Sequence, residues 1–297
     1  MGKNSEASAD QESSDVLSTY RKSGAAAAAL AHGDRSTSPS RAAAFFDVDN
    51  TIMRGASLFH FAAGLAAMNY FSGREIFGFG VKQLKFVLSG SEDPEDVASA
   101  TEAALSFVRG RRVDELIRLA EMVFDQRMVD KLIPGSLSLA QAHLDAGQEV
   151  WLVTATPVEL AQLLARRLGL TGALGTVSET KNGVYTGKLE GYPLHGLAKA
   201  EAIRALAITE NLDLAQCAAY SDSSNDIPML SAVGHPTAVN PDSELRAYAK
   251  KMGWDISDFR KRAQFREYAL PATTAASGIA FGLAAGYVAG RLIRASR

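Results

Sequence analysis

Two acidic pairs are the residues best able to do chemistry in this sequence. Asp47 and Asp49 stand two positions apart in DVDNT, so both carboxylates leave an extended chain on the same side, close enough to share a metal ion. Asp222 and Asp226 stand four positions apart in SDSSND. Carboxylate oxygens are ligands that hard cations prefer. Either pair alone is common, because acids at a strand end often cap the next turn.

Between the acidic pairs lie two side chains suited to phosphate oxygens. Thr154 ends an apolar run and offers a hydroxyl donor, and Lys199 stands near the start of a helical stretch and offers a positive charge. Taken singly, the hydroxyl means little and the lysine is an ordinary surface residue. The acids, the hydroxyl and the lysine follow one another in a single order, which makes coincidence a poor explanation.

Four short apolar runs must position these side chains. Helical stretches such as 159–170 and 199–208 alternate with the runs, which predicts an α/β fold with a mostly parallel sheet. Each polar cluster lies at the carboxyl end of a predicted strand, where open α/β sheets bind their ligands. The four predicted strands cover residues 42–46, 149–157, 217–226 and 235–241.

The remaining segments have other patterns. Residues 55–133 lack strand signals and carry long amphipathic stretches, which predicts a helical insertion after the first strand. Asn182 and Gly183, flanked by β-favouring residues, predict a hairpin. Residues 1–41 are rich in Ser, Ala, Asp and Glu, and Tyr20 is their only aromatic residue, so we expect a disordered tail.

Composition restricts the class of protein. The 297 residues are 47% hydrophobic and 22% charged, which is ordinary for a folded protein. A net charge of −2 offers no case for binding nucleic acid. The single cysteine, Cys217, lies in an apolar run and predicts a buried thiol in a reducing compartment. The first residues lack the apolar stretch of a secretory signal, so we expect a cytoplasmic location.

With these motifs the chain resembles the haloacid dehalogenase superfamily, in its phosphoserine phosphatase-like branch (subfamily IB). The resemblance rests on FFDVDNT, LVTATP, GLAK and AYSDSSNDIPML, followed by GHPTAVNPDSELRAYAKKMGW, and covers residues 42–254. It implies a Rossmann-like core of residues 42–54 and 134–256, with residues 55–133 as a mobile helical cap over the site.

The resemblance also implies a role for each motif residue. Asp47 would attack phosphorus and form an aspartyl phosphate, and Asp49 would act as general acid and base. Mg²⁺ would be held by Asp47, the Asp49 backbone carbonyl and Asp222, with Asp226 directly or one shell further out.

The phosphate group would be bound by other motif residues. Thr154 and Lys199 would contact its oxygens, and Asn225 would orient Lys199 or the nucleophile. The resemblance therefore implies a phosphate-binding set of Thr154, Lys199 and Asn225.

The substrate site departs from the branch at one position. Phosphoserine phosphatases carry an acid for the substrate's amino group five residues beyond the motif threonine, where this chain has Ala56. We therefore rank phosphoserine below other phosphomonoesters. Arg109, Arg111 and Arg112 offer charge for a carboxylate or a second phosphate, although a solvated helix start is their more ordinary role.

The carboxyl-terminal segment suggests attachment to a membrane. Residues 269–290 hold no charged side chain over twenty-two positions, about 33 Å of helix. Basic residues of the linker that begins at residue 257 precede this helix and would keep the enzyme on the inner face. The segment is rich in Ala and Gly, so a helix docked on the protein is the alternative. A glycine at every fourth position offers a face for self-association, formed by Gly278, Gly282, Gly286 and Gly290.

Together these features predict a membrane-associated, Mg²⁺-dependent phosphatase of small-molecule or lipid-derived phosphomonoesters. A phosphotransferase that passes the phosphoryl group to an alcohol is the alternative among enzymes. A non-catalytic membrane regulator that keeps the fold is the alternative outside enzymes.

Overall fold

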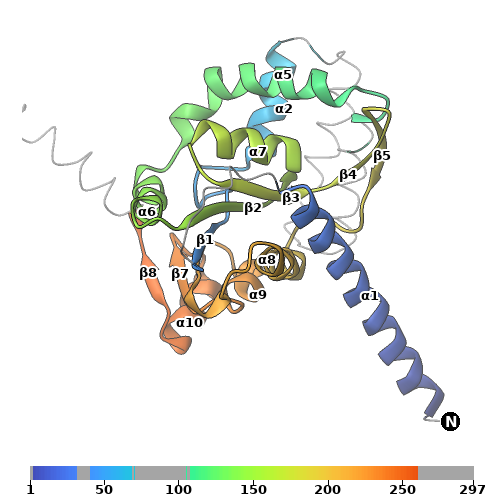
Figure 1. Cartoon of the computed structure of the whole chain (residues 1–297), viewed down its shortest axis with the longest axis vertical. Coiled ribbons are helices and arrows are strands. Elements are labelled where there is room, and N and C mark those ends of the chain that lie inside the picture. Colours follow the sequence, from blue (N-terminus) through green and yellow to red (C-terminus); the bar gives the residue numbers. More distant parts are fainter. Residues whose placement is uncertain (1–2, 32–40, 69, 71–104, 106–107, 260–297) are drawn as a thin grey trace, which may run out of the picture. The chain divides into compact units, whose positions relative to one another are not determined.

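The computed structural model describes residues 3–31, 41–68, 70, 105 and 108–259. Six strands form one sheet in the order β3-β2-β1-β6-β7-β8 (Figure 1). β1 pairs in parallel with β2 and β6, β2 with β3, and β6 with β7, which confirms the predicted α/β fold. The strands are β1 (Ala43–Phe46), β2 (Glu149–Pro157), β3 (Gly172–Thr176), β6 (Ala218–Ser221), β7 (His235–Val239) and β8 (Asp255–Ser257).

Helices cover both faces of this sheet. Phe45 lies in the main core cluster with Ile203 of α8, whereas Phe46 makes an edge contact with His143 of α6. Both rings are fully buried, as expected for a central strand with a layer on each side. Cys217 is buried in the main core, as predicted. The helices are α6 (Pro134–Asp145), α7 (Val158–Arg167), α8 (Leu197–Thr209), α9 (Ile227–Leu230) and α10 (Ser243–Met252), with short 3-10 turns η3 (Leu214–Gln216) and η4 (Ser224–Asp226).

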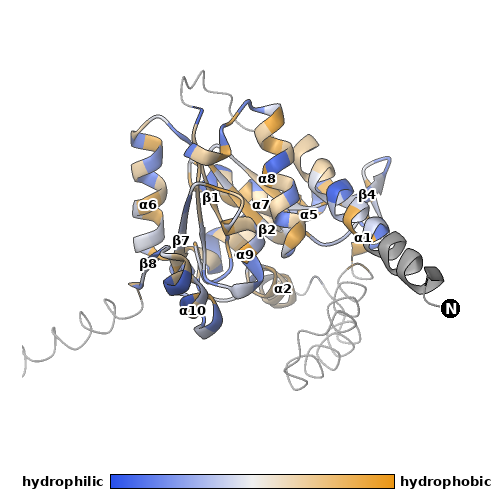
Figure 2. Cartoon of the chain, turned by 90° about the horizontal axis from the view of Figure 1, so that it is seen from below, coloured by the Kyte–Doolittle hydropathy of each residue, from blue (hydrophilic) through white to orange (hydrophobic). Residues whose placement is uncertain are grey.

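Local signals set the ends of several helices. Pro134 is the first residue of α6, where its missing N–H costs no hydrogen bond. The Asp242 side chain accepts a hydrogen bond from the Leu245 N–H and caps α10, and Gly253 ends that helix at φ +71°. In Figure 2 the central strands β1 and β2 are mainly orange, whereas α10 is mainly blue, as expected for an outer helix.

The predicted hairpin is present. β4 (Ser178–Lys181) and β5 (Val184–Leu189) pair antiparallel around Asn182 and Gly183, whose φ angles are +54° and +74°. Asn and Gly are the residues that adopt positive φ at low cost, so this pair sets the turn.

The described part of residues 55–133 is helical, as expected. It contains α2 (Ser57–Ala67), α5 (Val113–Val123), a π-helical turn η1 (Phe124–Met128) and a 3-10 turn η2 (Val129–Lys131). α2 and α5 pack on α7 through a small cluster that includes Phe61, Ala120 and Leu160. The division into a core domain and a separate cap stays a prediction.

The expected disorder of residues 1–41 is wrong for Lys3–Ala29, which form helix α1. Ser23, Gly24, Ala27 and Ala28 are buried, and α1 packs along α8. A Cβ at Gly24 would lie 2.6 Å from the Glu201 carbonyl carbon, so the two backbones are in close contact. The prediction failed because it required large apolar side chains, whereas this helix packs through small ones.

The predicted membrane helix 269–290 lies outside the described residues, together with its glycine face and most of the linker 257–297. Within the residues that the structure describes, no helix combines the length and the apolar character needed to cross a membrane.

Candidate active site

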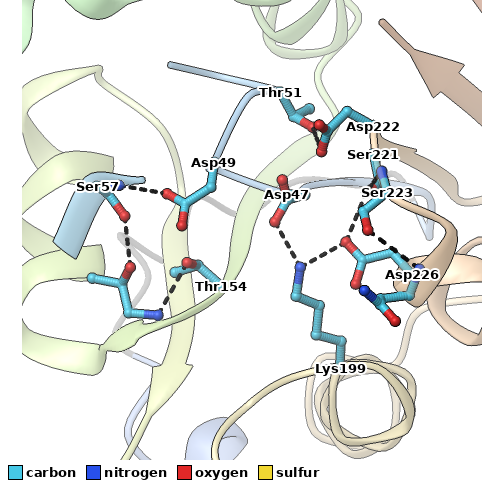
Figure 3. A network of polar contacts seen from close by, with 12 residues as sticks. Asp47, Asp49, Thr51, Ser57, Thr154, Lys199, Ser221, Asp222, Ser223 and Asp226 are labelled. Carbon is cyan, nitrogen blue, oxygen red and sulfur yellow. Dashed lines mark hydrogen bonds and ion pairs between the residues drawn. The ribbon is translucent and has the colours of Figure 1, made fainter. Parts of the chain in front are cut away.

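Most of the predicted site residues lie at or just after the carboxyl ends of neighbouring strands. Asp47 directly follows β1, and its N–H donates to the Tyr220 carbonyl of β6 at 2.9 Å. Thr154 lies in the last part of β2, and Asp222 directly follows β6. Lys199 reaches the same place from the first turn of α8 (Figure 3). The parallel order of β2, β1 and β6 therefore brings the separate motifs together.

A buried charged cluster lies at the centre of the site, formed by Asp47, Lys199 and Asp226. The Lys199 ammonium donates to Asp47 Oδ1 at 2.6 Å and to Asp226 Oδ2 at 2.7 Å. All three side chains are less than a tenth exposed. Ser221 Oγ donates a further hydrogen bond to Asp226 Oδ2 at 2.7 Å. One lysine thus binds the carboxylates of the first and last motifs.

Burial and neighbouring charges shift the pKa values of the acidic and basic groups in the cluster. Burial raises the pKa of Asp47 to about 8, although the Lys199 ammonium acts against the rise. The carboxylates of Asp226 and Asp49 add to it. Burial also raises the pKa of Asp222 to about 6, and Asp226 contributes. For Lys199, burial lowers the pKa, but the carboxylates of Asp226 and Asp47 outweigh burial and the net shift is upward.

The other residues of the acidic motif SDSSND lie only partly around the charged cluster. Thr51 Oγ1 donates a long hydrogen bond to Asp222 Oδ1 at 3.5 Å. Asn225 lies in η4, where its N–H donates to Ser223 Oγ at 3.3 Å. Its contact with Lys199 or Asp47 stays a prediction. Among the described residues no three His, Cys, Asp or Glu side chains gather as a metal site, so the ligand set also stays a prediction.

Two hydroxyls that sequence reasoning missed join the site to α2. The Ser57 N–H donates to Asp49 Oδ1 at 2.8 Å, and the Ser57 and Thr156 hydroxyls lie 2.6 Å apart. The Thr156 N–H in turn donates to Thr154 Oγ1 at 3.1 Å. The only signals in the sequence were a serine at the start of the helical insertion and a second threonine in TAT. Neither signal shows that the two residues meet.

The three arginines at the end of the insertion have separate surroundings. The Arg112 guanidinium pairs with Asp114 on the exposed start of α5 at 2.9 Å, which agrees with the expected solvated helix start. The Arg111 guanidinium stands over the Tyr70 ring, 4.5 Å from its centroid. Arg109 lies against Gly187 of the hairpin.

Comparisons with known proteins agree with this geometry. The model of the haloacid dehalogenase-like hydrolase family matches residues 44–231, more than half of the chain. A phosphoserine phosphatase of Mycobacterium tuberculosis is 52% identical over 248 residues, which cover 84% of this chain and 79% of that protein. The chain belongs to the haloacid dehalogenase-like hydrolase family. It is a phosphatase-type hydrolase, as its motifs predicted.

Solved structures share the fold. A protein of unknown function from Bordetella pertussis Tohama I has a TM-score of 0.66 and 28% identity, over 74% of this chain and 99% of that chain. A phosphoserine phosphatase in its apo form has a TM-score of 0.50 and 18% identity, over 74% and 94% of the two chains. At that identity the second likeness concerns the fold alone.

Proposed function

We propose that this protein is a Mg²⁺-dependent phosphomonoester phosphatase that forms an aspartyl phosphate on Asp47. The contact between Lys199 Nζ and Asp47 Oδ1, 2.6 Å apart at the end of β1, is the observation that carries this proposal. It places a positive charge beside a buried carboxylate. A phosphoryl group on that carboxylate would lie next to the ammonium.

The site's surplus of carboxylates fits a divalent cation. Lys199 donates to Asp47 and Asp226, and Asp222 follows on the neighbouring strand end. Burial, with neighbouring carboxylates, raises the pKa of Asp47 and of Asp222, and the ammonium only partly offsets the rise. Such oxygen donors suit Mg²⁺. Asp47, the Asp49 carbonyl and Asp222 would hold it, with Asp226 nearby. When bound, the ion supplies positive charge that keeps these carboxylates ionised and offsets charge on the phosphoryl oxygens.

The protein's own groups account for each bond change. Lys199 holds one oxygen of Asp47 and leaves the other free to attack phosphorus. As the new P–O bond forms, the bond to the leaving alcohol breaks and Asp49 donates a proton to that oxygen. Asp49 then takes a proton from water, which attacks phosphorus, releases inorganic phosphate and restores Asp47. Thr154 and Lys199 contact the phosphoryl oxygens throughout.

We propose that phosphoserine is not the preferred substrate. A relative at 52% identity is named a phosphoserine phosphatase, which supports a small phosphomonoester. Here, however, Ala56 directly precedes α2, and its methyl group gives no partner to an ammonium group. We expect O-phospho-3-hydroxypropionate, which lacks the amino group, to be hydrolysed at least as fast as phosphoserine. A clear preference for phosphoserine would contradict this choice of substrate and leave the reaction type intact.

Membrane attachment through residues 269–290 belongs to the same proposal. Its support is the length of chain without a charged side chain. Flotation of the full chain with phospholipid vesicles, compared with a chain that ends at residue 257, tests it. Equal flotation of the two chains would contradict attachment through this segment.

Phosphate release with Mg²⁺ from a panel of phosphomonoesters tests the reaction. We expect Asp47→Asn and an excess of EDTA each to abolish turnover. Asp145→Asn serves as the matched control. Asp145 is an exposed acid at the end of α6, and its carboxylate accepts a hydrogen bond from the Gln141 side chain. Equal rates for Asp47→Asn and the wild type would contradict the proposal.

A further inference from the structure

The bonds around Ser57 and Thr156 have no part in the reaction steps above. Ser57 is the first residue of α2, and Thr156 lies on β2, two positions after Thr154. Both side chains are almost fully buried, at 1% and 4% exposure. Their hydroxyl oxygens lie 2.6 Å apart, so each is the partner of the other. If either hydroxyl is removed, the other stays buried without a partner, which destabilises the folded protein.

The pair joins two elements that hold reacting groups. The Ser57 N–H holds Asp49 Oδ1 at 2.8 Å, and the Thr156 N–H holds Thr154 Oγ1 at 3.1 Å. The start of α2 therefore sets the direction of the Asp49 carboxylate and leaves its second oxygen for other contacts. Ala56, the residue before α2, has no polar side chain that could cap the helix. Asp49 caps α2 instead, because its carboxylate accepts the hydrogen bond of the first N–H of the helix. Any shift of α2 along β2 would break the hydroxyl pair and turn Asp49.

We propose that the Ser57–Thr156 hydroxyl pair is a latch that positions Asp49 for proton donation to the leaving alcohol. Ser57 and Thr156 are positioning residues, since they act through Asp49 and touch no reacting atom. This inference rests on the proposed function. The latch matters for alkyl phosphates, because an alkoxide leaves only with a proton. It matters little for p-nitrophenyl phosphate, whose leaving group is stable as an anion.

The ratio of kcat/KM for glycerol 2-phosphate to kcat/KM for p-nitrophenyl phosphate tests the latch. kcat/KM covers the steps up to transfer onto Asp47, so later hydrolysis does not enter. We expect Thr156→Val and Ser57→Ala to lower this ratio about 10-fold, which is part of the roughly 100- to 10,000-fold that general acid catalysis contributes. Thr156→Ser keeps the hydroxyl and should restore the wild-type ratio. The double variant Ser57→Ala with Thr156→Val leaves no buried hydroxyl unpaired and should still show the lowered ratio.

Thr171→Val is the matched control. Thr171 Oγ1 accepts a hydrogen bond from the Val150 N–H at the other end of β2, far along the strand from Thr156. We expect its ratio to equal that of the wild type. An equal loss on both substrates in the latch variants would show a merely structural role and overturn the proposal, and so would an unchanged ratio. The proposed function is tested separately. It is upheld if Asp47→Asn abolishes the turnover seen in the wild type, whichever value the ratio takes.

Discussion

Helix α8 takes part in two buried regions that are held together in different ways. On one side Lys199 joins the charged cluster with Asp47 and Asp226. On another side Glu201 and Ala202 meet α1 at Gly24, backbone against backbone. The first region depends on opposite charges that no water screens. The second depends on the absence of side chains, so that two helices approach closely.

This difference decides what a substitution does in each region. In the charged cluster, removing a group leaves an unpaired charge and also removes a reacting group. In the α1–α8 contact, adding a group pushes two helices apart and leaves the reacting groups in place. Substitutions in the charged cluster should therefore change both turnover and stability, whereas substitutions in the α1–α8 contact should change mainly stability.

The largest effect is expected from Lys199→Met. Without the ammonium, the buried carboxylates of Asp47 and Asp226 lose their shared counterion, and we expect the free energy of unfolding at pH 8 to fall by about 3–5 kcal/mol in metal-free buffer. Turnover should be lost as well. Urea unfolding and phosphate release measure the two effects. Lys188→Met, at an exposed lysine of β5, is the control and should change neither. If Lys199→Met were as stable as the wild type, the two buried carboxylates would not depend on the Lys199 ammonium as their counterion.

A second effect on stability is expected from pH, while Lys199 stays in place. The pKa of Asp47 is about 8 in the folded protein and 3.8 ordinarily, so the folded state binds more protons between these values. Stability should therefore fall as the pH rises from about 4 to about 8, with Asp222 contributing up to about pH 6. Urea midpoints in EDTA at pH 5 and pH 8 measure the fall.

Two comparisons isolate the cause of this pH dependence. Mg²⁺ at pH 8 should restore stability, because the ion favours the ionised carboxylates. Asp47→Asn should flatten the profile. A metal-free wild type that becomes more stable toward pH 8 would contradict the assignment.

A steric effect of about 2 kcal/mol is expected from Gly24→Val in the α1–α8 contact. The new Cβ would meet backbone atoms of Glu201 and Ala202 at 2.6 and 2.7 Å, and backbone cannot yield as a flexible side chain can. Ala25→Val is the matched control, because Ala25 is the next residue of α1 and is exposed. Gly24→Val should keep most of the wild-type turnover. Equal stability of the two variants would show that α1 does not pack on α8 in solution.

The smallest effect is expected from Arg21→Ala. Arg21 Nε lies 3.8 Å from Glu201 Oε2, and the arginine side chain is 68% exposed, so solvent screens the pair. Glu201 also keeps its bond from Arg204 at 2.6 Å. We expect the free energy of unfolding to change by less than about 0.5 kcal/mol. A loss as large as that of Gly24→Val would mean that charge, rather than close approach, holds α1.

The two regions also differ in how far the sequence could predict them. The strands that carry Asp47, Thr154 and Asp222 were predicted, because short apolar runs that end in polar residues are typical of buried parallel strands. The α1–α8 contact was missed, since alanines and one glycine carry no apolar stripe.

Two further features show the same limit. β3, with the sequence GALGT, was missed because it is short and poor in large side chains. The meeting of Ser57 and Thr156 was missed because it depends on how α2 packs against β2. Residue type predicts chemistry, whereas contacts between distant small or polar residues follow only from the fold.

Identification of the phosphorylated residue tests the central claim most directly. Wild-type protein mixed with substrate and Mg²⁺ is quenched in acid within one turnover, digested and analysed by mass spectrometry. The account predicts one phosphoryl group on the peptide that contains Asp47, removable by hydroxylamine and absent from Asp47→Asn. A phosphoryl group on another residue, or phosphate release with no labelled peptide, would contradict it.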